Sequence, residues 1–368
     1  MTLIYFILVL GITVLIHELG HFIFAKRAGI YIYEFSIGMG PRLFKFKRKN
    51  DETEYSIRLF PIGGYVSMAG EDIEVDKNIP KEKQMQSKTW LQRFLTIIAG
   101  VLFNFLLAIV LLFIIGLING VPNDKPYIEK ISKNAPIYKS NIKEGDLITK
   151  VNKTKVKDNE SLVLELQVNK GKDIDVEILH KNGKKEVIKA APIKEGKNKG
   201  SYGFVLDSTI KRGIIPSIKY AFTKTYSLLR QMVIIIGYLC VGKLSLNNLA
   251  GPIGIFNIVG QAAKVGFINI IYLIAYLCIN VGLINIIPLP AFDGGRLLFL
   301  IIEKIKGNPV NPKIENTIHT IGFMLLMALM IFISYNDILR ILKYILTSIF
   351  FRQKNNYINI KIKLVILC

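Results

Sequence analysis

The stretch VLIHELGHFIFA, from Val14 to Ala25, sets two histidines and a glutamate within a run that is otherwise apolar. The apolar run extends from Leu3 to Phe24, about the length that a helix requires to cross a bilayer. On insertion scales each charged side chain at membrane depth costs about 2.5 to 3.5 kcal/mol. Ionisable groups so close together therefore need a partner, and a metal ion is the natural one.

His17 and His21 lie four residues apart, so on a helix both imidazoles project from one face. Both can reach one zinc ion, while Glu18 lies beside them and can take a proton from a water at the metal. This H-E-x-x-H pattern is typical of zincins. The alternative is an incidental pattern on a buried helix whose histidines are satisfied by neighbours, and the cost of membrane depth makes that alternative the weaker one.

A catalytic zinc commonly has three protein ligands, so a third residue is required. Asp293 is the best candidate, because it follows a span in the segment NIIPLPAFDGGRLL, where Pro288 and Pro290 prevent a regular helix. Irregular backbone at membrane depth is tolerated only where it is buried in protein or lines a wet cavity. The competing interpretation is that Asp293 only caps the helix that begins at GGRLL.

The composition indicates a membrane protein with a soluble part, since 51% of the 368 residues are hydrophobic and mean hydropathy is positive. The net charge of +21 comes from Lys and Arg spread through loops, which favours contact with membrane lipid over nucleic acid. Three isolated cysteines (Cys240, Cys278 and Cys368) predict neither a disulfide framework nor a thiolate metal site.

We expect a polytopic α-helical membrane protein with about four transmembrane helices, a membrane-associated β-hairpin and an inserted extracytoplasmic α+β domain. The expected segments are a first span with the H-E-x-x-H pattern (1–25), a cytoplasmic-side segment (26–92) containing the hairpin (54–68), a second span (93–118), the folded domain (119–212), an interfacial amphipathic connector (213–267), a third span (268–302), a cytoplasmic loop (303–317), a fourth span (318–345) and a tail (346–368).

The folded domain has clear local signals. YIEKI, DLITKVN and GSYGFVL read as strands, DIDVEIL pairs naturally with KEVIKA across Asn182-Gly183, and Asp158 caps a helix that runs through Val168. We expect His180 beside this turn, and His319 at the mouth of the last span, to be surface or interface residues and not ligands.

Topology gives an independent test of the metal site. Short basic loops after the first span and between the third and fourth spans predict that both lie in the cytoplasm, with the termini and the folded domain outside. His17 and Asp293 then reach similar depth only if the first and third spans run in the same direction. This excludes Met232 to Val241 as an additional span, and that piece is too short to cross comfortably.

With these residues in view, the chain resembles bacterial site-2 proteases, which cleave anti-sigma factors after a first cut elsewhere. HELGH is similar to the family's zinc-binding helix, and NIIPLPAFDGG to its N-x-x-P-x-P-x-L-D-G motif, with Phe292 where Leu is usual. Other similar segments are FSIGMGPRLF, FPIGGYVSMAGED, LAGPIGI, and AGVLFNF with Gly100 and Asn104. The Lys-rich tail from Arg352 has no recognised counterpart.

The resemblance implies that His17, His21 and Asp293 hold Zn²⁺ and that Glu18 is the general base. It implies that Asn285 helps to hold the substrate backbone or the oxyanion. The segment from Glu54 to Met68 would pair with an unwound substrate, and its alternative role is a surface hairpin without substrate. Further substrate contacts would fall at Pro288, Gly63 and Gly64.

The resemblance also makes the folded domain a single PDZ-like domain. The expected partners are single-span membrane proteins, either anti-sigma factors or signal-peptide remnants; oligomeric state and substrate identity stay open. Two rival functions come from other classes. A non-catalytic membrane scaffold would gather partners through the PDZ-like domain, and a metal-ion carrier would use the same ligands for transport but is expected to have inverted repeats, which the sequence does not display.

Overall fold

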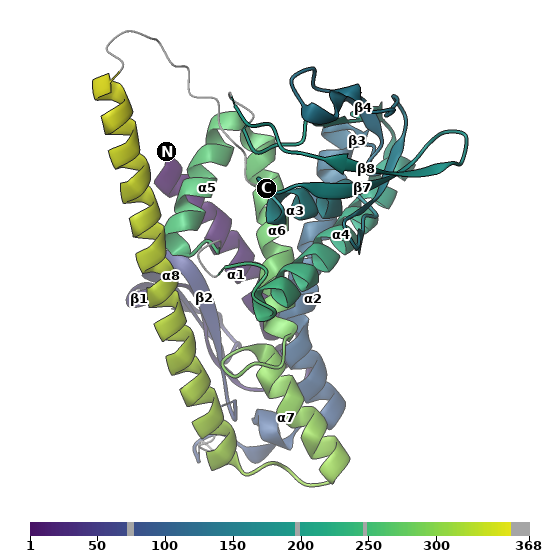
Figure 1. Ribbon diagram of the computed structural model, residues 1–368. Helices are drawn as coiled ribbons and strands as arrows, with labels where there is room; N and C mark the ends of the chain where they lie inside the picture. The colour runs from purple at the N-terminus through teal and green to yellow at the C-terminus, as the bar shows by residue number, and fades with distance from the viewer. Residues whose placement is uncertain (72–76, 196–198, 246–248, 355–368) are drawn as a thin grey trace.

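The computed structural model describes residues 1–71, 77–195, 199–245 and 249–354. Within them, four helices are long and apolar enough to cross a membrane, as the hydropathy pattern predicted: α1 (Thr2–Arg27), α2 (Trp90–Asn119), α6 (Phe267–Ile286) and residues Lys313–Leu342 of α8 (Pro312–Lys354). Figure 1 shows α8 running along one side of the molecule, while α1, α2 and α6 form its centre.

The central helices approach one another closely because small residues lie where they cross. A Cβ atom at Gly20 of α1 would lie 2.4 Å from the Ala99 carbonyl oxygen of α2, so the two backbones meet there without side chains between them. Gly282 of α6 similarly faces the Phe105 ring of α2. Burial of residues such as Val9, Leu112 and Ile279 completes this core, which fixes α1 against α2.

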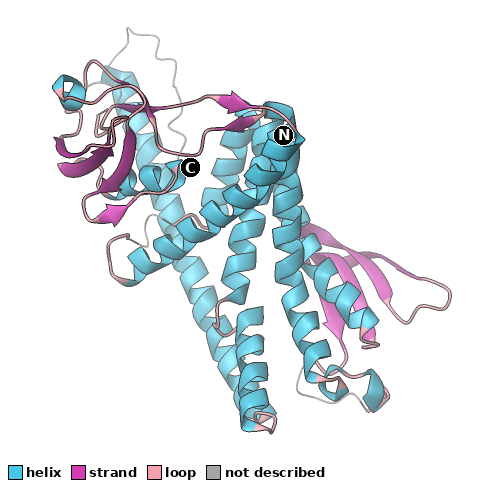
Figure 2. Cartoon of the chain, turned by 90° about the vertical axis from the view of Figure 1, so that its right-hand side faces the viewer, coloured by secondary structure: helices cyan, strands magenta, loops and turns pink. Residues whose placement is uncertain are grey.

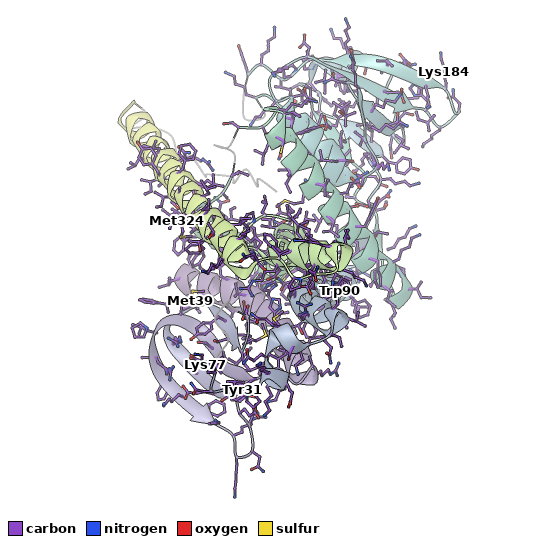
Figure 3. The ribbon with its side chains drawn as sticks, turned by 90° about the horizontal axis from the view of Figure 1, so that it is seen from below. Tyr31, Met39, Lys77, Trp90, Lys184 and Met324 are labelled. Atoms are coloured by element: carbon purple, nitrogen blue, oxygen red, sulfur yellow. The ribbon has the colours of Figure 1, made fainter. Side chains whose placement is uncertain are left out.

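The third span differs from the expected single segment 268–302. Helix α6 ends at Ile286, and a separate helix, α7 (Asp293–Lys306), begins at the candidate ligand. Pro288 and Pro290 lie between the two helices, where the missing N–H of each would break a continuing helix. Figure 3 shows Trp90 beside α7, and the Trp90 indole N–H donates to the Leu300 carbonyl oxygen of α7 at 2.8 Å.

A β-sheet lies beside α1, but its pairing is not the hairpin predicted within residues 54–68. The partner of β2 (Glu54–Met68) is β1 (Ile32–Lys47), a strand that the sequence had not indicated. Residues 34–37 of β1 pair with residues 54–57 on one side and with 64–67 on the other. The prediction failed because strand pairing depends on long-range contacts, whereas the Pro and Gly-Gly signal reports only a local bend.

A buried ionic cluster ties this sheet together. The carboxylate of Glu34 accepts hydrogen bonds from Arg58 at 2.9 Å and from the Tyr65 hydroxyl at 2.6 Å, and it also accepts one from Ser56. Burial alone would raise the pKa of Glu34, but the hydrogen bonds from Ser56 and Tyr65 hold the pKa below its ordinary value. The charged carboxylate therefore fixes residues 64–68 against the rest of the sheet.

The block after α2 has the elements that its sequence predicted: β4 (Ile128–Ile131), β5 (Leu147–Val151), β7 (Ile174–Leu179), β8 (Lys185–Ala190), β9 (Phe204–Leu206) and helix α3 (Asn159–Val168). The shorter elements are β3 (Val121–Pro122), β6 (Thr154–Lys155) and β10 (Ile210–Lys211). The strand order is β6-β5-β7-β8, with β4 paired to β9. Asp158 caps α3 through a hydrogen bond from the Ser161 backbone N–H at 2.9 Å.

The segment Met232–Val241 is not a separate apolar piece but continues a longer helix, α4 (Ile214–Cys240), and α5 (Pro252–Val265) follows it. Helix α4 packs against α2 and docks the folded block. The Asp158 carboxylate accepts hydrogen bonds from Ser227 at 2.9 Å and Arg230 at 2.6 Å, and Lys224 forms an ion pair with Glu160. In Figure 2 the folded block lies at the upper end of the helical bundle, and the β1–β2 sheet flanks the lower half of the bundle on the other side.

Candidate metal centre and active site

Three candidate ligand atoms from distant parts of the chain converge on one point. The Nε2 atoms of His17 and His21 lie 3.2 Å apart. The Asp293 Oδ2 atom lies 3.1 Å from His17 Nε2 and 3.4 Å from His21 Nε2. Both histidines are buried on α1, and the aspartate begins α7. The depth argument from the sequence, which required α1 and the third span to run in the same direction, is consistent with this meeting.

These separations fit a zinc ion. Ligands about 2.0 to 2.1 Å from a tetrahedral zinc lie roughly 3.3 Å from one another, and two imidazoles with one carboxylate leave the fourth position open for a reactant. The Asp293 Oδ2 atom is buried and accepts no hydrogen bond from the described residues, although both imidazoles lie close to it. A buried oxygen in this condition is costly unless a cation satisfies it, so the donor set suits the metal.

Helix α2 holds both imidazoles in the orientation that a metal requires. His21 donates its Nδ1–H to the Thr96 carbonyl oxygen at 2.8 Å, which leaves the Nε2 lone pair for the metal. The Asn104 side-chain nitrogen lies 3.4 Å from His17 Nδ1, while its oxygen is buried without a partner. We assign the amide turned by 180°, because its oxygen then accepts the Nδ1–H of His17 and the Nε2 lone pair is left for the metal.

Gly100 lies between Thr96 and Asn104 on the same face of α2. A Cβ atom at this position would lie 2.4 Å from His21 Nε2 and 2.7 Å from His17 Cε1. Only glycine therefore leaves room for the histidine pair. Sequence resemblance had drawn attention to Gly100 and Asn104 but missed Thr96, which contacts His21 through its backbone carbonyl and not through its side chain.

Two cavities meet at the convergent residues. The larger, of about 440 Å³, and the smaller, of about 250 Å³, are both lined by His17, Glu18 and Asp293. The larger cavity also includes residues of β2, α7 and α8, namely Tyr65, Val66, Met68, Arg296, His319, Thr320 and Phe323. Glu18 is therefore accessible from both cavities.

Not all of the predicted substrate-binding residues lie near Glu18 and the two cavities. Asn285 lines the smaller cavity together with Glu18. Gly64 lies beside Glu18, since a Cβ atom there would be 3.9 Å from Glu18 Cγ, and the same atom at Gly63 would be 3.7 Å from Val14 Cγ1. Pro288 is exposed and is not among the residues that line these two cavities.

The sequence predicted His180 and His319 as surface or interface residues and not as ligands, and the structure gives each of them a specific hydrogen-bond partner. His180 is largely buried between two carboxylates, with Nδ1 2.8 Å from Asp146 and Nε2 3.1 Å from Glu186. His319 lines the larger cavity and accepts a hydrogen bond from the Ala291 backbone N–H at 3.1 Å. Neither contact could be read from the sequence, because Asp146 and Ala291 lie far along the chain from the histidines that they contact.

An apolar helical bundle with a His, His, Asp centre and a glutamate beside it defines the class of membrane-embedded metallopeptidases. The model of Peptidase family M50 matches residues 5–329. The zinc metalloprotease RasP of Bacillus licheniformis is 34% identical, over 92% of this chain and 99% of that protein. The regulator of sigma-W protease RasP of Bacillus subtilis is 32% identical, over 92% and 99%. The RasP of Geobacillus kaustophilus is 33% identical, over 92% and 97%.

The chain belongs to Peptidase family M50. It is an intramembrane zinc metalloprotease of the site-2 protease type, and zinc is its cofactor. The resemblance inferred from the HELGH and NIIPLPAFDGG motifs is thereby confirmed, and a non-catalytic scaffold or an ion carrier is not the function of this chain.

Proposed function

We propose that the chain cleaves peptide bonds in or near the transmembrane segments of single-span membrane proteins, with His17, His21 and Asp293 holding zinc and Glu18 as general base. The observation that carries this assignment is the convergence of three ligand atoms within 3.1 to 3.4 Å of one another. Zinc, when bound, polarises the scissile carbonyl and lowers the pKa of water.

Glu18 is suited to move the proton. Its side chain lines both cavities next to the ligand atoms, so a water molecule between the substrate and the carboxylate lies within its reach. The Glu18 carboxylate accepts a proton from that water as the water attacks the carbonyl carbon. It then delivers the proton to the leaving amine nitrogen. Asn285, on the other side of Glu18, is positioned to hold the substrate backbone or the oxyanion.

Residues 64–68 of β2 supply an edge for the substrate strand. They pair with β1 on one side, and no strand of the described residues pairs with their other edge. Tyr65, Val66 and Met68 line the larger cavity, and Gly64 lies beside Glu18. A substrate helix must unwind before its carbonyls are accessible, and an added strand replaces the backbone hydrogen bonds lost on unwinding.

The name of a relative supports a class of substrate. A protein that is 32% identical is named regulator of sigma-W protease, which favours membrane-bound regulators of transcription, such as anti-sigma factors, as substrates. Remnant signal peptides are the second candidate, because they too are single apolar helices. In both cases the substrate lies in the bacterial plasma membrane together with the enzyme.

The arrangement of the chain supports an extracytoplasmic PDZ-like domain at 119–212. The folded block follows the end of α2 that lies opposite α7, and the loop between α7 and α8 carries the basic residues expected in the cytoplasm. Docking of this block on α4, through Asp158 and Arg230, fixes it above the bundle. In that position it acts as a size filter that excludes substrates whose external domain has not been trimmed.

Removal of the filter provides a test. Deleting residues 125–208 is expected to permit cleavage of substrates that retain their external domain, which the intact protein rejects. Cleavage of both substrate forms is followed by gel mobility in proteoliposomes, with a trimmed substrate as the control for activity. Strict discrimination by the deletion variant would remove the filter role without affecting the zinc site.

Metal removal tests the reaction itself. Purified protein incubated with candidate single-span substrates is expected to cleave them, to stop when a zinc chelator removes the metal, and to recover when zinc is restored. Product is measured by mass spectrometry, which also locates the cleaved bond. Cleavage that continues at the same rate in protein proven free of zinc would contradict the proposed mechanism.

A further inference from the structure

The third ligand reaches the site from a short irregular segment between α6 and α7. Within this segment Ala291 has a backbone φ of +73°, in the left-handed region that residues with a Cβ atom seldom adopt. A non-glycine residue persists in such a conformation only when the surrounding structure holds it there. Ala291 lies two residues before Asp293, so any relaxation of its backbone would move the carboxylate.

A histidine from the last span holds this backbone. The Ala291 N–H donates to His319 Nδ1 at 3.1 Å, and the imidazole lies against α7, with its ring centre 5.7 Å from that of Phe299. Because Nδ1 accepts, the neutral ring carries its proton on Nε2. One turn further along α8, a Cβ atom at Gly322 would lie 2.1 Å from Pro290 Cβ, so the helix contacts the segment at two places.

If His319 served only to fill space, its imidazole would cost stability without any gain. Its Nε2 atom is buried and has no hydrogen-bond partner in the described part of the chain. A leucine of similar volume would fill the space and would have no polar atom of its own to satisfy. What leucine lacks is an acceptor at the position of Nδ1, and the Ala291 N–H is the donor that needs it.

We propose that His319 is a positioning residue for zinc: by accepting the Ala291 N–H it keeps the strained Ala291 backbone in place and so holds the Asp293 carboxylate at the metal. This rests on the proposed zinc site. His319 does not itself bind the metal, since the convergent set comprises His17, His21 and Asp293, and Nδ1 is already engaged. Helix α8 thereby contributes to the metal centre through the hydrogen bond that His319 accepts.

The test measures zinc affinity of the purified full chain in detergent by competition with a chromophoric chelator, alongside cleavage. His319→Leu is expected to weaken zinc binding by about 10-fold to 100-fold, as loss of a group that orients a ligand does. His319→Asn places its amide oxygen where Nδ1 lies and is expected to bind zinc as the wild type does. His319→Gln places its amide at the Nε2 position and is expected to resemble the leucine variant.

A second variant removes the backbone strain at Ala291, so that the hydrogen bond to His319 is no longer needed. Glycine adopts a φ of +73° without cost, so Ala291→Gly added to His319→Leu is expected to recover most of the lost zinc affinity. A merely structural role of His319 would not respond in this way. The proposal would be overturned if His319→Leu bound zinc as tightly as the wild type. It would also be overturned if His319→Asn bound zinc as weakly as His319→Leu and Ala291→Gly did not restore the affinity of the leucine variant.

Two controls distinguish the role of His319 from the docking of α8 as a whole and from the zinc site itself. Asp337→Asn alters a second attachment of α8, where the Asp337 carboxylate accepts the backbone N–H groups of Gly251 and Gly254 at 2.9 and 2.7 Å. It is expected to leave zinc affinity unchanged, and a defect equal to that of His319→Leu would assign the effect to docking of α8 as a whole. Asp293→Ala tests the zinc site itself: unchanged zinc binding there would refute the proposed ligand set, independently of His319.

Discussion

Replacing Glu18 with glutamine is expected to lower the rate of peptide cleavage by about 10²-fold to 10⁴-fold, the usual contribution of a general base, while zinc stays bound. Glutamine has nearly the same shape as glutamate but cannot accept the proton of the attacking water. The proposed metal ligands are unaffected, because His17, His21 and Asp293 converge on one another and Glu18 contributes no atom to that set.

The measurement combines two readouts on the same preparation: zinc per protein by elemental analysis, and product formation from a single-span substrate in proteoliposomes. His17→Ala is the matched control, because it removes a proposed ligand from the same turn of α1 and should lose both zinc and activity. A Glu18→Gln variant that cleaves at the wild-type rate would assign the proton transfer to another group and leave the zinc site standing.

The candidate metal ligands could be predicted from the sequence because each lies in a local context that is unfavourable in a membrane span and that a metal site would explain. His17 and His21 are costly within an apolar span, and Asp293 follows prolines that break one. The folded block was also predictable, since Asp158 and the Asn182-Gly183 turn are short-range signals. Each of these inferences uses only residues that are neighbours in the chain.

The contacts that complete the site were not predictable in this way. Strand β1, the Thr96 carbonyl that fixes His21 and the His319 contact to Ala291 all depend on which distant segments pack together. A backbone carbonyl has no signature in a sequence, and a histidine that supports a loop looks the same as one on the surface. Long-range pairing thus carries the information that periodicity and motif spacing lack.

Replacing Gly100 with alanine is expected to abolish cleavage and to weaken zinc binding by at least about 100-fold, although the change adds a single methyl group in a membrane helix. The added carbon would lie 2.4 Å from His21 Nε2, much closer than two non-bonded atoms approach. The atoms that it would contact belong to the imidazole rings of His17 and His21, the proposed ligands. Either the imidazoles turn away from Asp293 or α1 moves from α2, and both movements separate the ligand atoms.

Gly237→Ala in α4 provides the matched control, since a Cβ atom there meets nothing within 4 Å and alanine favours the helix. This variant should bind zinc and cleave as the wild type does. Thermal unfolding of the zinc-free proteins then distinguishes a local effect from a loss of fold, because overpacking costs typically about 1 to 3 kcal/mol and leaves the bundle assembled. If Gly100→Ala retained wild-type zinc affinity, the close approach of α2 to the histidine pair could not be what shapes the metal centre.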